Sequence, residues 1–411
     1  MARHRTIGPS ALMLGGAGVI IGVAAAWLVS QGNPGNMGVC VACFNRDIAG
    51  AFGGAWANMG GVAYIRPEII GLLFGGAVAA VATREFRPRG GSSVVLRFML
   101  GFIFMLSSLI FLGCTVRAWL RLGGGDLNAL WGIAGIAAGV VAGALFLKRG
   151  FNLGRARVLP RPVGWIGTGM MGVLLVFALM TEFGSPAGFV TTTAAGARAT
   201  AEGAVIQGEA VLRPEDASLV DGEVVAADGA VISPAASVEK ATPLPGGRRA
   251  PLLISLVAGL ALGVVAQRSR FCTMGGFRDL VLVRRFDLLF AAVGLLVGST
   301  VANLVLGQYN LGFTGQPVAH TDALGNFAAM AVAGLAAAML GGCPFRQVIM
   351  SGEGDADAFV AVLGMIAGAL VAHRFVIAST GAGLAENAWP ALAVMMAVLL
   401  GIAFVKRERL A

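Results

Sequence analysis

The sequence predicts an all-α polytopic membrane protein built from two related halves. Hydrophobic residues make up 57% of the chain and charged residues 12%, and the mean hydropathy is +0.82. In soluble domains charged residues are about a quarter of the chain, so this composition excludes an ordinary soluble enzyme. A short pattern of cysteine, arginine and aspartate also recurs at a constant spacing, which indicates a duplication.

Ten apolar segments are long enough to cross a bilayer, whose hydrocarbon core of roughly 30 Å takes about 20 helical residues. We expect the first five near 11–30, 61–82, 94–113, 128–147 and 163–181, and the second five near 251–267, 286–306, 323–341, 357–376 and 386–405. Five crossings per half is an odd number, so the second half should enter the membrane upside down. The two halves are therefore predicted to form an inverted repeat.

The predicted repeats are residues 1–190 and 250–411, and the segment 191–249 separates them. This segment contains four prolines, is rich in alanine, glycine and acidic residues, and has no helical apolar stripe. Such a composition favours a flexible extracytoplasmic linker. A small folded β module around Ala204–Val231 is the alternative.

The basic residues predict the orientation. A net charge of +9 would favour nucleic acid as a partner in a soluble chain, but here the basic residues cluster at the ends of apolar segments. Arg3 and Arg5 precede the first segment and Lys406 follows the last, whereas Gln308–Asn326 contains no Lys or Arg. Because cytoplasmic loops carry an excess of Lys and Arg, both termini are predicted to be cytoplasmic.

The repeated residues are a cysteine, an arginine and an aspartate in two turns of each half. At a spacing of 229 residues they are Cys114, Arg117 and Asp126 with Cys343, Arg346 and Asp355; at 232 they are Cys40, Arg46 and Asp47 with Cys272, Arg278 and Asp279. The segments that hold them, too short to span a bilayer, are Asn36–Phe52, Cys114–Gly123, Phe271–Val283 and Cys343–Gly352. We expect re-entrant half-helices there, since irregular backbone at membrane depth must be buried or line a cavity. Gly135-x3-Gly139 and Gly364-x3-Gly368 also repeat, and they predict close helix packing.

The chemistry of these turns favours a soft, sulfur-like anion. A half-helix N-terminus offers free N–H groups and a partial positive charge, and a thiol is a weak, polarisable donor. Each neighbouring arginine either attracts the anion or pairs with the aspartate of its turn. A buried cysteine is more often a small core residue, but repetition in both halves argues for a role. The candidate contacts are Cys40, Cys114, Cys272, Cys343, Arg46, Arg117, Arg278 and Arg346. Cys40-x2-Cys43 has the spacing of a redox or zinc pair, but no second pair accompanies it.

Three stretches resemble the YeeE/YedE family: Gly38–Gly50, Gln267–Gly276 and Gly342–Arg346. The closest resemblance is to the YedE branch, which is associated with selenium transport. This resemblance implies a bacterial inner-membrane protein related to thiosulfate importers, in which an hourglass of inverted repeats passes a sulfur-containing anion along a line of cysteines. The family's thiols carry over to Cys40, Cys114, Cys272 and Cys343, and Cys43 could substitute for Cys40.

The sequence therefore predicts a transporter that imports a small selenium- or sulfur-containing anion through a path lined by thiols. Its expected partners are this anion, the lipid bilayer and a small cytoplasmic sulfur- or selenium-carrier protein, with no nucleic acid, cofactor or metal. The runner-up is a thiosulfate importer proper. A membrane sulfur- or selenium-transferase that forms a persulfide is a further alternative, although no general base lies near a thiol in sequence. An anchor for a soluble selenium-handling protein is the last.

Overall fold

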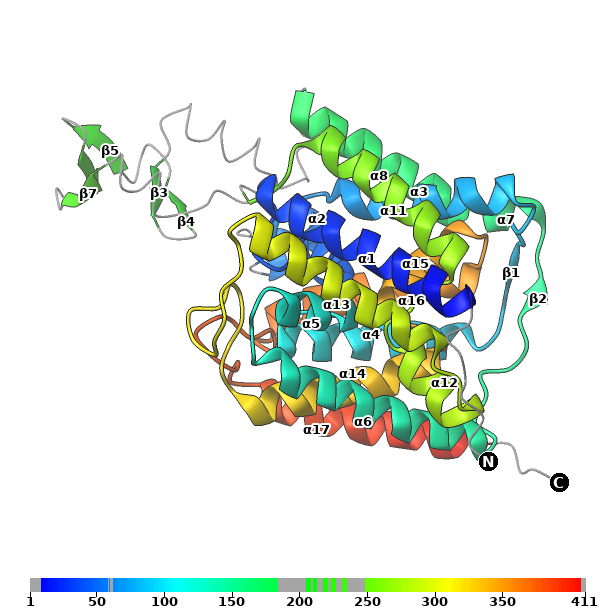
Figure 1. Ribbon diagram of the computed structural model, residues 1–411. Helices are drawn as coiled ribbons and strands as arrows, with labels where there is room; N and C mark the ends of the chain where they lie inside the picture. Colours follow the sequence, from blue (N-terminus) through cyan, green and yellow to red (C-terminus); the bar gives the residue numbers. More distant parts are fainter. Residues whose placement is uncertain are drawn as a thin grey trace.

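A computed structural model describes residues 9–57, 59, 62–183, 205–207, 210–212, 217–220, 223–226, 231–234 and 248–407. Nine helices in these ranges are long and apolar enough to cross a membrane. They lie side by side and form one helical body (Figure 1). The chain is therefore an all-α, multi-pass membrane protein, as the sequence predicts.

The helices follow the expected segments in order. In the first half they are α1 (Pro9–Ser30), α2 (Val41–Ala57), α3 (Pro67–Ala82), α4 (Val94–Phe111), α5 (Thr115–Gly123), α6 (Ala129–Lys148), α7 (Arg161–Gly164) and α8 (Ile166–Phe183). In the second they are α11 (Leu252–Ser269), α12 (Gly275–Val283), α13 (Asp287–Val305), α14 (Ala323–Leu340), α15 (Pro344–Gly352), α16 (Ala356–Arg374) and α17 (Ala388–Val405). Each of the ten expected spans contains a helix, and α2, α5, α12 and α15 occupy the four predicted short segments.

Helix α3 is shorter than the expected span 61–82, which is a correction. It has 16 residues and begins at Pro67, because proline is tolerated in the first turn of a helix but not further inside. Arg66, immediately before it, donates a hydrogen bond of 2.6 Å from Nε to Asp47 Oδ2 of α2. Arg66 itself is extended, with φ −74° and ψ 109°, which is the conformation that a residue before proline favours.

The long helices pair reciprocally. Helix α1 packs along α13 and α3 along α11, while α6 packs along α14 and α4 along α16. If the short helix α7 is left out, the helices of the two halves correspond in chain order: α1 to α11, α3 to α13, α4 to α14 and α6 to α16. The pair α1–α13 then corresponds to the pair α11–α3. In the same way, the pair α6–α14 corresponds to the pair α16–α4. Two copies related by a two-fold axis would pair in this way. The opposite orientation of the halves in the membrane stays a prediction.

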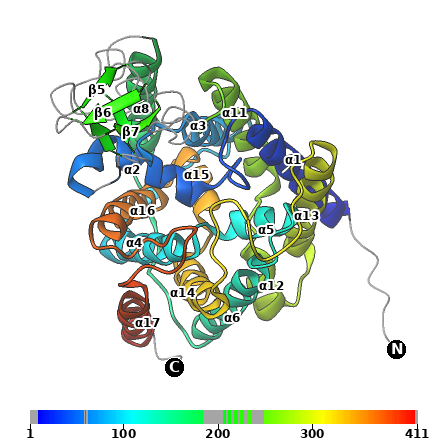
Figure 2. The same ribbon diagram turned by 90° about the vertical axis from the view of Figure 1, so that its left-hand side faces the viewer.

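Short helices occupy the middle of this body. Figure 2 shows α5 and α15 inside a ring of long helices, with α8 and α17 at its rim. Helix α5 packs on α13 and α6, and α15 packs on α3 and α16. Helices α5 and α15 are therefore surrounded by longer helices.

The repeated glycines are sites of close helix packing, as predicted. A Cβ atom at Gly139 of α6 would lie 2.0 Å from the Ala331 carbonyl oxygen of α14. At Gly364 of α16 it would lie 2.2 Å from the Phe98 carbonyl oxygen of α4. These distances are far below van der Waals contact, so the two helix pairs approach as closely as they do only because a side chain is missing.

The strands within the described residues are short and form sheets of two or three strands. Strand β1 (Arg89–Gly90) pairs antiparallel with β2 (Arg157–Val158) beside the helices. Most of the expected linker 191–249 lies outside the described residues. Its described parts are antiparallel: β3 (Val205–Gln207) with β4 (Ala210–Leu212), and β6 (Glu223–Ala226) between β5 (Ala217–Val220) and β7 (Val231–Pro234). They fall where the sequence leaves a small β module open as the alternative.

Candidate functional site

The cysteines stand at the starts of the short helices. Cys40, Cys114 and Cys343 immediately precede α2, α5 and α15, and Cys272 lies three residues before α12. All five cysteines of the chain are free and buried. The first N–H groups of a helix have no partner within the helix and carry a partial positive charge. Four such helix starts therefore bring anion-favouring groups to the thiols.

Cys114 and Cys343 are positioned by the same kind of tight turn between two helices. Helices α4 and α14 each end at a residue in the left-handed conformation, Leu112 with φ 65° and Gly341 with φ 92°. The cysteine two residues later is extended, with φ −85° and ψ 178° for Cys114 and φ −69° and ψ 165° for Cys343. A leucine in the left-handed region is uncommon, so the first half keeps this turn without the glycine that favours it.

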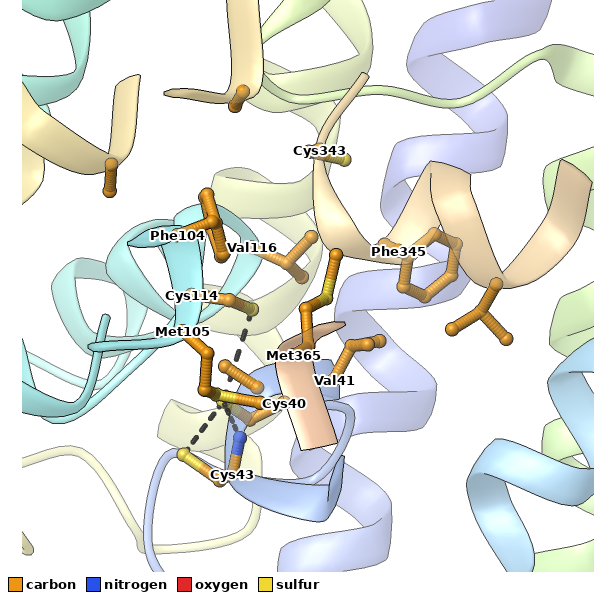
Figure 3. Packing of buried hydrophobic residues seen from close by; sticks show 14 of the residues in the cluster. Cys40, Val41, Cys43, Phe104, Met105, Cys114, Val116, Cys343, Phe345 and Met365 are labelled. Atoms are coloured by element: carbon orange, nitrogen blue, oxygen red, sulfur yellow. Dashed lines mark hydrogen bonds between the residues drawn. The ribbon is translucent and has the colours of Figure 1, made fainter. Parts of the chain in front are cut away.

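Three thiols form the first-half thiol group, which consists of Cys40, Cys43 and Cys114. The Sγ atom of Cys40 lies 2.8 Å from that of Cys43 and 3.8 Å from that of Cys114. Figure 3 shows Cys40 between the other two, joined to each by a dashed line. Arg117 Nη1 lies 4.0 Å from Cys43 Sγ. Cys43 therefore belongs with the predicted thiols, although it has no counterpart in the second half.

Cys272 and Cys343 form the second-half thiol group, and their thiols are near enough to influence each other electrostatically. In Figure 3, Cys343 lies apart from Cys114, with Val116 and Met365 between them. The residues that follow two of the cysteines join the groups, since Thr273 Oγ1 lies 3.1 Å from Thr115 Oγ1. The structure thus brings all four predicted thiols to the centre of the helical body.

The thiol groups are closed off from the surroundings. Cys272 is 6% exposed, and the other four cysteines are at most 1% exposed. The rings of Phe271 and Phe345, beside the second-half group, meet edge to face with 5.5 Å between their centroids. The structure is therefore an occluded arrangement, and an anion could reach the thiols only after side chains move.

Two buried amides in the same short helices have atoms without partners. Asn45 of α2 is fully buried, and neither its Oδ1 nor its Nδ2 has a hydrogen-bond partner among the described residues. In α15, Gln347 Nε2 lies 3.4 Å from the Gly342 carbonyl oxygen, while Gln347 Oε1 is unpartnered within the described part of the chain. Buried polar atoms normally have a partner, so water or a substrate is expected beside these amides.

Two of the four predicted arginines pair with the aspartate of their own turn. Arg46 Nη2 lies 2.6 Å from Asp47 Oδ1, and Arg278 Nε lies 2.9 Å from Asp279 Oδ1. Asp47 also binds Arg66, at 2.6 Å. The carboxylate of Asp47 therefore lies between two buried guanidinium groups, which favours a structural role for Arg46.

The expected pair of Arg346 with Asp355 is wrong. Arg346 Nη1 lies 3.0 Å from Glu353 Oε1, and Arg270 Nη1 lies 2.8 Å from the same oxygen. Asp355 caps α16 by accepting a hydrogen bond from Ala358 N at 3.0 Å. This cap fixes its carboxylate where Arg89 Nε reaches it at 2.7 Å.

A further carboxylate completes this charged cluster. Glu85 Oε2 accepts a hydrogen bond from Gln267 Nε2 at 2.6 Å and lies 2.8 Å from Arg270 Nη2. The hydrogen bond from Gln267, with Arg270 and Arg268 nearby, lowers the pKa of Glu85. Glu85 therefore remains ionised at neutral pH and helps to bind Arg270.

The expected pair of Arg117 with Asp126 is also wrong. Asp126 Oδ2 lies 2.6 Å from Arg121 Nε, and both side chains are fully buried. Arg121 stands one helical turn after Arg117, nearer to the loop that holds Asp126, so it takes the carboxylate.

Arg117 is held by backbone carbonyls instead. Its guanidinium donates a hydrogen bond to the carbonyl oxygen of Leu112. It also donates, at 3.2–3.4 Å, to four further carbonyl oxygens, those of Gly35, Asn36, Pro317 and Val318. None of the described carboxylates forms an ion pair with it. Arg117 is fully buried, so the first-half thiol group has an un-neutralised positive charge beside it.

Sequence reasoning missed Arg66, Arg121 and Glu353 as parts of this region, and it left open whether Cys40 or Cys43 is the functional thiol. The C-x2-C spacing was a usable signal for Cys43, because residues three apart lie on one face of a helix. For the charged residues the signal was weaker, because the spacing along the chain does not say which of two nearby side chains reaches a given partner.

Comparisons with known proteins agree with this geometry. A family model described as sulphur transport matches residues 268–405, which include Cys272, Cys343, Arg278 and Arg346. This match over the second half agrees with the resemblance of the sequence motifs to the YeeE/YedE family. It is also 30% identical over 112 residues to the thiosulfate transporter TsuA of Escherichia coli (strain K12). That alignment covers 27% of this chain and 31% of TsuA, so the chain spans about a third of the length of this relative.

Proposed function

We propose that the chain carries a small sulfur- or selenium-containing anion across the membrane through a path formed by the two thiol groups. The observation that supports this most directly is the meeting of short helix starts, each with a cysteine, inside a closed helical body. Thiols and N-terminal N–H groups can contact a soft anion without a metal or a strongly basic site. The match to a sulphur-transport family and the similarity to a thiosulfate transporter favour thiosulfate as the first substrate to test.

The charge of Arg117 supports an anionic substrate. A fully buried guanidinium without a carboxylate is costly at membrane depth, where charged groups usually serve a substrate pathway. A dianion beside the first-half thiol group would offset this charge. Arg117 is therefore the strongest of the four predicted arginine contacts, while Arg46, Arg278 and Arg346 already have carboxylate partners.

Uptake of labelled anions tests the proposal. In cells that lack other importers, expression of the chain should raise the uptake of radiolabelled thiosulfate well above the background of the empty vector. Radiolabelled selenite tests the selenium alternative in the same cells, and labelled sulfate is the control for a substrate without a sulfane sulfur or selenium. Uptake of neither thiosulfate nor selenite, with the protein present in the membrane, would contradict the proposed function.

The proposal includes an orientation. We infer that the chain lies in a bacterial inner membrane with both termini in the cytoplasm and the segment 191–249 outside, because the basic residues favour this arrangement. The cytoplasmic carrier protein for sulfur or selenium is then the expected acceptor of the imported anion. The inverted orientation of the halves follows from the same topology.

Reporter fusions check the orientation. A cytoplasm-active reporter after Ala411 should be active, and a reporter active only outside the cytoplasm should be active when inserted at Gly222. The same two reporters exchanged between these sites are the controls and should be inactive. Signals of the opposite kind at both positions would overturn the proposed topology.

A further inference from the structure

We propose that Cys40 and Cys43 form a reversible disulfide, and that this bond closes the thiol path. The closing of the path rests on the proposed transport function, whereas the formation of the bond does not. Both thiols are free in the structure, and their Sγ atoms are 2.8 Å apart. A disulfide bond is about 2.05 Å long, so less than about 1 Å of movement separates the thiol pair from the bonded state.

Full burial of Cys40 disfavours its thiolate, and three features beside it offset part of this cost. Cys40 stands at the start of α2, and the backbone N–H of Cys43 donates to Cys40 Sγ at 3.4 Å. Arg117 Nη1 lies 4.0 Å from Cys43 Sγ, which adds a positive charge on the other side of the pair. A helix start, a nearby cation and the Cys-x-x-Cys spacing are the features that make a cysteine reactive.

A peroxide is the oxidant that the proposal requires. The Cys40 thiolate attacks one oxygen of hydrogen peroxide, so that a sulfenic acid forms on Cys40 and the other oxygen leaves as hydroxide, which takes up a proton to become water. The Cys43 thiol then attacks the Cys40 sulfur and displaces the second oxygen, again as water after proton transfer. Two thiols thus lose two electrons, hydrogen peroxide gains them, and two waters and one disulfide result. A small dithiol reverses the step by thiol–disulfide exchange.

The bond would take Cys40 out of the thiol path. Cys40 is the thiol that connects Cys43 with Cys114, at 2.8 Å and 3.8 Å. Once bonded to Cys43, its sulfur has no S–H to offer an anion beside Cys114. At the spacing of 232 residues the counterpart of Cys43 is Gly275, so the second half cannot form the equivalent bond. The first half alone therefore carries a Cys-x-x-Cys pair.

The test uses the full-length protein in proteoliposomes. Samples are treated with hydrogen peroxide, the remaining thiols are alkylated after denaturation, and peptides are analysed by mass spectrometry. We expect a Cys40–Cys43 disulfide and a loss of radiolabelled thiosulfate uptake, with both reversed by dithiothreitol. In Cys43→Ser, uptake after peroxide should equal the untreated uptake of the same variant.

Met105→Leu is the matched control, because Met105 is a buried, oxidisable sulfur that Figure 3 places beside Cys40. This variant should keep the wild-type sensitivity to peroxide. A Cys40–Cys114 bond in place of the expected one, an absence of any disulfide, or peroxide-sensitive uptake in Cys43→Ser would overturn the proposal. A protein that forms the Cys40–Cys43 bond but never transports thiosulfate or selenite would leave the modification site standing and refute the proposed function.

Discussion

Cys114→Ala and Cys343→Ala are each expected to reduce uptake to the background level while the protein stays in the membrane in normal amount. The two thiols stand at equivalent helix starts, one in each thiol group, so an anion that follows the path must meet both. Replacement of a buried thiol by a methyl group removes little volume and typically costs under about 2 kcal/mol of stability. Loss of uptake should therefore reflect the lost contact and not a loss of folding. The measurements are initial uptake of labelled thiosulfate and immunoblot quantification of purified membranes.

Cys43→Ala is the control for these two variants, because it is the same substitution at another fully buried thiol. We expect a much milder loss of uptake, since no thiol in the second half corresponds to Cys43. Normal uptake by Cys114→Ala or Cys343→Ala would refute the thiol path. Strongly reduced membrane abundance would instead show that the thiol contributes to folding.

Asp126→Asn is expected to destabilise the protein by about 3–5 kcal/mol, because it leaves the Arg121 guanidinium buried without its carboxylate. Both side chains of this pair are fully buried, and Nε and Oδ2 are 2.6 Å apart. An apolar replacement of a buried pair is often neutral, so adding Arg121→Met should restore much of the lost stability. The measurements are membrane abundance and the melting temperature of the purified protein in detergent.

An exposed ion pair provides the control for this experiment. Arg285 Nη2 and Asp287 Oδ2 are also 2.6 Å apart, but the Arg285 side chain is 66% exposed. Asp287→Asn should therefore change stability by no more than about 1 kcal/mol. If Asp126→Asn were as mild as Asp287→Asn, or if the double variant were no better than the single one, the buried pair would not stabilise the fold as we infer.

The membrane class, the order of the helices and the short helices were all predictable from the sequence. Hydropathy and length were sufficient for this, because hydrocarbon tolerates few structures other than helices that satisfy their own backbone. The cysteines were found through their repetition. The start of α3 was not predicted, although Pro67 was a usable signal, because the residue before a proline disfavours the helical conformation.

The sequence did not predict which carboxylate each arginine pairs with. Arg346 had Glu353 and Asp355 within nine residues, and only the cap of α16 directs Asp355 away from it. Arg117 had Asp126 in the expected place, but Arg121 is nearer to that carboxylate in the structure. Two arginines one helical turn apart lie at different distances from the loop that follows the helix. The number of residues between an arginine and an aspartate therefore does not predict which arginine binds it.

Arg346 is paired with a carboxylate and Arg117 is not, and this difference affects how an anion would move under a membrane potential. At the spacing of 229 residues the position of Glu353 corresponds to Gly124, so the first half has no carboxylate where the second half neutralises its arginine. An imported dianion moves against the membrane potential, at about 2.3 kcal/mol per elementary charge per 100 mV. The fixed charge of Arg117 cannot change that total, but it lowers the energy of the anion at the first-half thiol group. The anion should therefore wait beside Arg117, and the slow step should be its passage towards Cys343, where voltage and the neutralised Arg346 give it no comparable attraction.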